Sequence, residues 1–142
     1  MKANRLITAF LLLTPFIGCT GQTTSKEVVT AGNNSDKIEA YYFHFTARCT
    51  TCRTVEAKAK EDLESLYPNQ VKQGLITFQS LNLEEAPNKT LADKLGVSGQ
   101  TLLLVKGDQK INLTNEGFMY AVAKPEKFKE IIKEKVDGLL TR

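Results

Sequence analysis

Two cysteines separated by two residues, Cys49 and Cys52, stand between an aromatic stretch and an amphipathic stretch of the chain. Residues 38–45 (IEAYYFHF) are mostly apolar and are bounded by polar segments, a pattern typical of a buried strand. From Cys52 to Tyr67, apolar side chains recur at helical spacing with Lys and Glu between them, and Pro68 follows. The pair therefore falls where a strand passes into a helix, and the fold has to accommodate it at that junction.

Strand-like and helix-like patterns alternate along the rest of the chain. A continuous apolar run at residues 101–105 is too short for a helix and predicts a central strand, covered on both faces. The other predicted elements are strands at 75–83 and 111–114, a helix at 87–95 and a final helix that opens at Pro125. This order indicates one α/β domain with a four-stranded mixed sheet. A chain of 142 residues, 42% of them hydrophobic, suits one such domain.

The position of the cysteine pair has chemical consequences. A cysteine at the start of a helix meets unpaired N–H groups and the positive end of the helix dipole, which favour thiolate over thiol. Arg48 and Arg53 flank the pair and act in the same direction. We therefore expect Cys49 to be the reactive thiol and Cys52 to be the shielded thiol that closes or resolves a disulfide. A structural disulfide in an oxidising compartment is the alternative.

His44 is the only histidine of the chain. Within an apolar strand, it is interpreted as a core residue that makes one hydrogen bond. The other option is a third ligand beside Cys49 and Cys52, because a Cys2His set suits Cu(I) or zinc. The protein would then be a soft-metal binding and transfer module. No other cofactor is expected.

From about residue 37 to residue 140, the chain resembles the thioredoxin superfamily. The stretch YYFHFTARCTTCR is similar to the strand, active-site loop and helix start of that family, and KLGVSGQTLLLVKGD is similar to the segment that leads into its third strand. The resemblance implies a thioredoxin-like fold and disulfide exchange, in which Cys49 attacks and Cys52 resolves. It also implies partner proteins that carry thiols or disulfides.

Two positions near the pair depart from the family pattern. Arg48 replaces the usual Trp before the first cysteine, which removes an apolar docking surface and adds a fixed charge. Phe43 or His44 stands where thioredoxins bury an Asp near the pair. The proton acceptor for the second thiol is therefore missing or changed.

The loop that faces the pair in the family departs as well, since it normally carries a cis-proline before the third strand. Here it runs Gly99, Gln100, Thr101. A cis bond before a residue other than proline costs about 2.5–4 kcal/mol, so we expect a trans peptide between Gly99 and Gln100. The resemblance makes these three residues the substrate loop, and the missing proline narrows the range of partners or opens the pair to a metal ion.

An apolar run at residues 6–17 follows a basic start and is too short to span a bilayer, which is typical of a secretory signal. The run ends in FIGC at residues 16–19, which resembles the lipobox of bacterial lipoproteins, although Phe16 stands where Leu is usual. The resemblance implies a signal peptide at residues 1–18 and lipidation of Cys19. An ordinary cleaved signal or an uncleaved anchor is the alternative.

Residues 19–36 are rich in Thr, Ser, Gly, Asn and charge and predict a flexible tether ahead of a domain at 37–142. Without Lys2 and Arg5, the 19 basic residues fall to 17, against 16 acidic ones. The chain has no long basic run, so a nucleic-acid partner is not expected. A lipid on Cys19 would attach the domain to a membrane outside the cytoplasm.

The sequence thus predicts a membrane-anchored, extracytoplasmic thiol-disulfide oxidoreductase that exchanges electrons with a partner protein or a membrane reductase. The alternatives are the Cu or Zn module described above and a non-catalytic or electron-transfer subunit of a membrane reductase complex. The second alternative arises because the lipobox and the YYFHFTARCTTC stretch also resemble secreted lipoproteins of the nitrophenyl-compound nitroreductase subunit family.

Overall fold

The structure is a computed structural model that describes residues 36–141. The predicted signal peptide, Cys19 and all of the predicted tether except its last residue lie outside the described residues. In chain order the elements are β1 (Ile38–His44), α1 (Thr50–Leu66), α2 (Pro68–Lys72), β2 (Ile76–Asn82), α3 (Ala86–Leu95), β3 (Thr101–Lys106), β4 (Gln109–Asn112), α4 (Thr114–Tyr120) and α5 (Pro125–Leu140). Within residues 36–141, no helix has both the length and the apolar character needed to cross a membrane.

The four strands form one mixed sheet in the order β2-β1-β3-β4. Strand β1 pairs in parallel with β2 and antiparallel with β3, and β3 pairs antiparallel with β4. The two central strands are therefore β1 and β3, the two stretches with the most continuous apolar sequence. The predicted α/β fold, a four-stranded mixed sheet flanked by helices, is confirmed.

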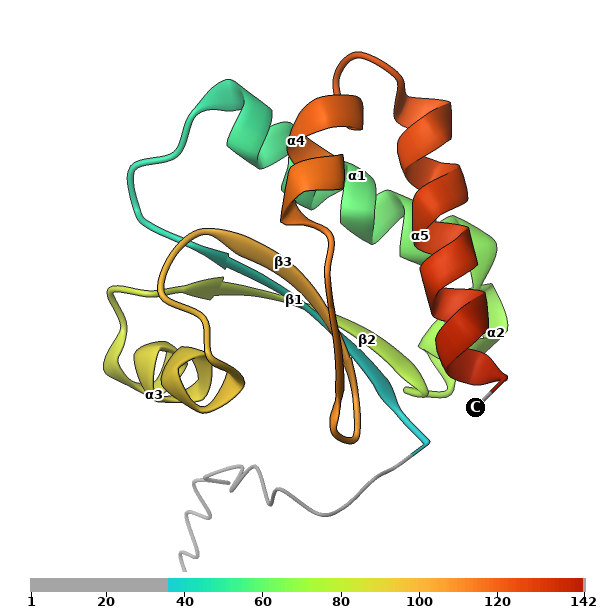
Figure 1. Ribbon diagram of the computed structural model, residues 1–142, viewed down its shortest axis with the longest axis horizontal. Coiled ribbons are helices and arrows are strands. Elements are labelled where there is room, and N and C mark those ends of the chain that lie inside the picture. The colour runs from blue at the N-terminus through green and yellow to red at the C-terminus, as the bar shows by residue number, and fades with distance from the viewer. Residues whose placement is uncertain (1–35, 142) are drawn as a thin grey trace, which may run out of the picture. The chain divides into compact units, whose positions relative to one another are not determined.

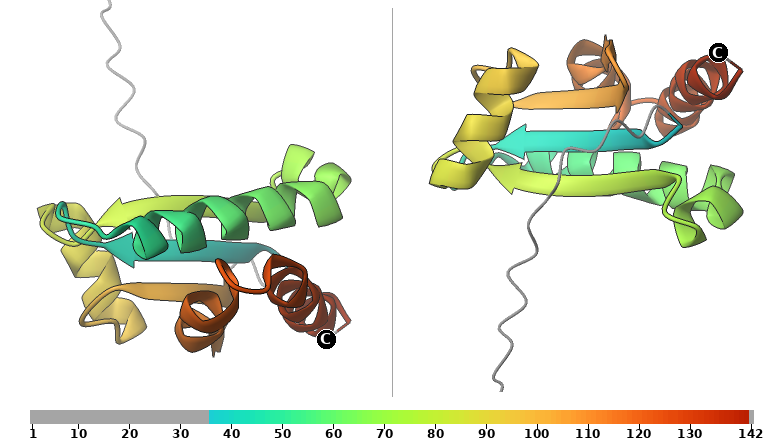
Figure 2. Two further views of the ribbon diagram at one scale, coloured as in Figure 1. Left: turned by 90° about the horizontal axis from the view of Figure 1, so that it is seen from above. Right: turned by 90° about the horizontal axis from the view of Figure 1, so that it is seen from below.

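Helices cover both faces of this sheet (Figures 1 and 2), and the pleat of β1 decides which side chains each face receives. Ile38, Ala40 and Tyr42 point into the larger core, which α1 and α5 close. Tyr41 and Phe43 point to the opposite face, into a smaller core that α3 closes. Because both faces of β1 are buried, its sequence shows no alternation of apolar and polar residues.

Two short helices, α2 and α4, lie in segments where the sequence predicts no helix. Pro68 ends α1 as expected, but it also opens α2, because proline is well suited to the first turn of a helix. The strand predicted at 111–114 is wrong at its end, since β4 stops at Asn112 and α4 begins at Thr114. The Asn112 side chain accepts a hydrogen bond from the Thr114 N–H at 2.9 Å, which turns the chain out of the sheet.

Helix α4 packs closely on α1 through Gly117. A methyl group at this position would lie 2.7 Å from Cγ1 of Val55, which is fully buried one turn beyond the cysteine pair. This contact ties α4 to the helix that carries the cysteines.

We expect Gly117→Ala to lower the free energy of unfolding by about 1–3 kcal/mol, because the new methyl overpacks the contact with Val55. Gly138→Ala is the matched control, since a methyl at that position of α5 meets open space. It should raise stability by up to about 1 kcal/mol through helix propensity. Urea denaturation measures both, and equal gains in the two variants would contradict the close contact.

A second feature of α1 is a buried carboxyl group. Asp62 is 4% exposed, and its Oδ2 atom has no hydrogen-bond partner among the described residues. Burial raises the pKa of the Asp62 carboxyl to about 6, against an opposing effect of the Lys129 ammonium. The ordinary value is 3.8. Folding therefore favours the protonated carboxyl. The contribution of this group to the free energy of unfolding is full below about pH 4 and is lost as the pH rises through about 6.

We expect Asp62→Asn to raise the free energy of unfolding by about 1–2 kcal/mol near pH ~7.5 and to change it little near pH ~3.5, because only the charged form is penalised by burial. Thermal denaturation across this range measures the difference. Asp93→Asn is the control, since Asp93 is an exposed carboxylate of α3. The same gain at both pH values would show that the effect does not arise from ionisation.

Candidate functional site

Cys49 and Cys52 form a disulfide, with their Cα atoms 5.1 Å apart. Cys49 is the N-cap residue of α1 and is exposed, whereas Cys52 is only 7% exposed. The backbone N–H of Cys52 donates to Cys49 Sγ at 3.1 Å. The structure therefore presents one sulfur atom to the outside, at the start of a helix, and keeps the other beneath it. This is the arrangement of exposed and shielded sulfur that the sequence predicts.

The charges around the pair differ from the expectation. Arg48 Nη1 forms an ion pair with Glu56 Oε2, and both side chains are largely buried. Glu56 lies one turn beyond Cys52 on α1, and it compensates the Arg48 charge that was expected to act on Cys49. Arg53 is exposed. The first turn of α1 contains no acidic residue, so its free N–H groups and its dipole remain the main source of positive potential at Cys49 Sγ.

Tyr42 reaches the pair from β1. Its hydroxyl donates to the backbone carbonyl of Cys52 at 2.7 Å and accepts a hydrogen bond from Nε2 of Gln100. Burial raises the pKa of Tyr42, so the hydroxyl stays protonated and remains a donor. The residue belongs to the stretch at 38–45 that the sequence predicts to be a buried strand. Its fully buried ring is core, but its polar end belongs to the site.

The residue of β1 that lies near the cysteine pair is Tyr42, whereas the sequence predicted Phe43 or His44 at this place. Phe43 was one candidate, but the pleat of β1 turns it to the opposite face, where it joins Ala92 and Val97. His44, the other candidate, is 8% exposed, and its Nδ1–H donates to the Phe45 carbonyl at 2.9 Å. A tyrosine hydroxyl thus stands near Cys52, and it meets the backbone of that residue.

His44 does not join the cysteines in a metal centre. Its imidazole is engaged with the neighbouring backbone, as the core interpretation predicted. Within residues 36–141, no group of three His, Cys, Asp or Glu side chains is arranged to hold a metal ion. The Cys49, Cys52 and His44 ligand set is therefore not assembled in this structure.

The loop at Gly99, Gln100 and Thr101 contacts the site through one side chain, the Gln100 amide. The described residues contain no cis peptide bond, so the peptide between Gly99 and Gln100 is trans, as predicted. The Thr101 hydroxyl donates to the Gly99 carbonyl at 3.0 Å. The loop is thereby folded on itself with Gln100 directed at Tyr42.

The loop between β1 and α1 is hydrogen-bonded to residues at the end of β2 and just after it. The Thr46 N–H donates to Glu84 Oε2 at 2.9 Å, and Asn82 Nδ2 donates to the Thr46 hydroxyl at 2.8 Å. Phe45, next to this anchor, is 43% exposed. An exposed aromatic side chain therefore lies four residues before the exposed sulfur.

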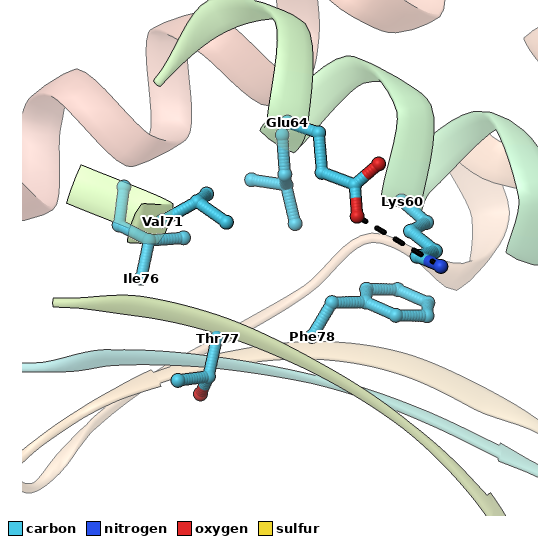
Figure 3. A pocket seen from close by; sticks show the side chains of 7 residues that line it. Lys60, Glu64, Val71, Ile76, Thr77 and Phe78 are labelled. Carbon is cyan, nitrogen blue, oxygen red and sulfur yellow. Dashed lines mark ion pairs between the residues drawn. The ribbon is translucent and has the colours of Figure 1, made fainter. Parts of the chain in front are cut away.

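Two hollows lie elsewhere on the domain. One, of about 260 Å³, lies between α1, α2 and β2 (Figure 3). Val71, Ile76 and Phe78 line it, and the ion pair of Lys60 and Glu64, at 3.8 Å, crosses its rim. The other, of about 360 Å³, lies between β4 and α5. Neither of these two hollows is lined by a cysteine.

No protein-family model and no curated protein matches the chain. Among solved structures, it is similar to oxidised thioredoxin O2 from Arabidopsis thaliana, at 20% identity and a TM-score of 0.46, over 72% of this chain and 77% of that one. It is also similar to the thioredoxin Deadhead from Drosophila melanogaster, at 17% identity and a TM-score of 0.45, over 70% of this chain and 81% of that one. A third similar structure is that of a malarial protein, at 23% identity and a TM-score of 0.37, over 52% of this chain and 74% of that one.

Two of these three structures are thioredoxins. At such identities and TM-scores, they assign no activity to this chain. Its chemistry has to be argued from its own cysteine pair.

Proposed function

We propose that the protein is a thiol-disulfide oxidoreductase that exchanges two electrons with a partner protein through Cys49 and Cys52. The observation that carries the proposal is the disulfide between an exposed sulfur at the start of α1 and a shielded sulfur one turn inward. An exposed sulfur can be attacked by a partner thiolate, and a shielded one leaves and returns without meeting other proteins.

The reaction proceeds in two exchanges. A thiolate of a reduced partner attacks Cys49 Sγ, the bond between Cys49 and Cys52 breaks, and Cys52 leaves as a thiolate that takes up a proton. A second thiolate of the partner then attacks the partner's own sulfur in the mixed disulfide and releases the Cys49 thiolate. The partner dithiol has lost two electrons and the pair has gained them. The reverse sequence reduces a partner disulfide.

The proposed direction is oxidation of the partner. The free N–H groups and the dipole of α1 stabilise the Cys49 thiolate, which belongs to the reduced form of the pair. A stabilised reduced form makes the disulfide a better oxidant. The Arg48 guanidinium adds less than its position in the sequence suggests, because Glu56 neutralises it.

The proposal includes a lipid anchor at Cys19 and a location outside the cytoplasm. The lipobox-like residues at 16–19 and the polar stretch at 19–36 support it. The fold is compatible with such an anchor, since β1 starts at the end of the sheet away from the cysteine pair and ends beside it (Figure 1). The partner would carry a thiol or disulfide, as a protein substrate or a membrane reductase.

Cys49→Ser is expected to abolish both oxidation of a dithiol peptide and reduction of insulin, whereas Cys52→Ser should trap a mixed disulfide at Cys49. In the reduced wild type, alkylation of Cys49 against pH should report a pKa below the ordinary thiol value of about 8.5. The Lys72→Ala variant is the control, because it leaves both cysteines in place and changes only an exposed residue of α2. An ordinary pKa together with full activity in Cys49→Ser would refute the proposal.

The anchor is tested separately. The full chain produced in a bacterium should appear in the membrane fraction with the mass of a diacylglycerol on Cys19, and Cys19→Ala should move it out of that fraction. Mass spectrometry of the purified protein measures the modification. An unmodified Cys19 would remove the anchor from the proposal and leave the redox chemistry of the domain in place.

A further inference from the structure

Three groups from separate parts of the chain form a line beneath the cysteine pair. The Gln100 amide stands in the loop before β3, the Tyr42 hydroxyl projects from β1, and the Cys52 carbonyl belongs to the first turn of α1. Gln100 is separated from Tyr42 by 58 residues, and Tyr42 from Cys52 by 10. The line therefore ties a loop, the sheet and the helix together at the shielded cysteine.

The direction of both hydrogen bonds follows from the groups themselves. The Cys52 carbonyl can only accept, so the single hydroxyl hydrogen of Tyr42 points at it. The hydroxyl oxygen is then free to accept from Gln100 Nε2. Hydrogen bonds arranged in such a chain polarise and strengthen one another. Tyr42 is fully buried, so bulk water does not reach its hydroxyl in this structure.

None of the atoms in this line is a sulfur atom. The line can therefore persist when the disulfide opens, and it holds the backbone of Cys52 near the place from which its thiolate has to attack. We propose that Tyr42 and Gln100 are positioning residues that raise the effective concentration of the Cys52 thiolate at Cys49. This inference rests on the proposed function and concerns the closing step, in which Cys52 attacks Cys49 in the reverse sequence and the internal disulfide forms again.

In the closing step, Cys49 is joined to a sulfur of the partner and Cys52 has given its proton to solvent. The Cys52 thiolate attacks Cys49 Sγ, the bond between Cys49 and Cys52 forms, and the partner sulfur leaves as a thiolate that takes up a proton. No further oxidant is needed, because the mixed disulfide already holds the oxidising equivalents. Alignment of the attacking group is the part that the protein controls, and misplacement lowers the rate and the equilibrium constant together.

Tyr42→Phe removes the hydroxyl and keeps the ring. The full chain, with Cys19→Ser in every variant so that only the pair reacts, is equilibrated with reduced and oxidised glutathione and quenched with acid. Mass spectrometry gives the ratio of internal disulfide to mixed disulfide with glutathione. We expect this ratio to fall about 3- to 10-fold in Tyr42→Phe, as for the loss of one intramolecular hydrogen bond. A tenfold change corresponds to about 30 mV in reduction potential.

Tyr41→Phe is the matched control. Tyr41 is the neighbouring tyrosine of β1, but it lies on the opposite face of the sheet, beside Phe43. Removal of its hydroxyl should leave the ratio unchanged. An unchanged ratio in Tyr42→Phe, or an equal fall in Tyr41→Phe, would overturn the inference.

The role of Gln100 is tested by its dependence on Tyr42. Gln100→Leu should also lower the ratio of internal to mixed disulfide, but by a smaller factor than Tyr42→Phe, since the hydrogen bond from Tyr42 to Cys52 remains. If Gln100 acts only through the tyrosine, Gln100→Leu combined with Tyr42→Phe should equal Tyr42→Phe alone. A further fall in the double variant would show that Gln100 acts by another route. Gln100 is a loop residue, so its variant also serves if Tyr42→Phe does not fold.

Two readouts separate positioning from a loss of stability. The pH profile of Cys49 alkylation should not move in Tyr42→Phe, because the line does not touch Cys49. A lower melting temperature with an unchanged glutathione ratio would mean a structural role only and would overturn the inference. Neither result bears on the proposed function, which is refuted only by an ordinary pKa of Cys49 together with full activity in Cys49→Ser.

Discussion

The packing of α1 across β1 is the contact on which the site depends. Val55, Ala59 and Leu63 of α1 are buried against the face of β1 that carries Ala40 and Tyr42. This contact sets the height at which the helix begins relative to the sheet, and with it the place of Cys49. The cysteine pair needs no pocket of its own, because the end of a strand and the start of a helix already bring one sulfur to the surface and one beneath it.

Two sources of positive charge lie near Cys49, the start of α1 and the Arg48 guanidinium, and only the second is neutralised by an ion pair. The start of α1 acts through its N–H groups, one of which donates to Cys49 Sγ, and no acidic residue of the first turn opposes them. The charge of Arg48 is compensated by its ion pair with Glu56, eight residues further along the chain. The reactivity of Cys49 therefore depends on the helix more than on the Arg48 cation.

Much of the fold follows from local pattern, and the misses have physical causes. The strand before the pair, the helix after it and the Gly96 cap of α3 each follow from periodicity or from a residue type with one conformational use. Helix α4 was missed because its sequence has no apolar stripe. Phe118 and Met119 are exposed, and the helix is held by the fit of Gly117 on Val55, a contact between distant segments.

The polar partners of the pair were missed for a related reason. Both faces of β1 are buried, so the sequence contains no alternation that tells whether Tyr42 or Phe43 faces α1. The link to Gln100 depends on how a loop folds back onto the sheet, and the pairing of Arg48 with Glu56 depends on the residue at which α1 begins. These are consequences of the packed fold, which a linear pattern does not carry.

The tyrosine hydroxyl next to Cys52 limits how the shielded thiol can lose its proton. Burial raises the pKa of Tyr42 above its ordinary value of 10, so near neutral pH the phenol is a donor and takes no proton from Cys52. The hydroxyl meets a backbone carbonyl, which ties it to the position of Cys52. Position and proton transfer are therefore served by different groups in this domain. The phenol holds the backbone of Cys52, and the proton of the Cys52 thiol goes to an acceptor other than Tyr42.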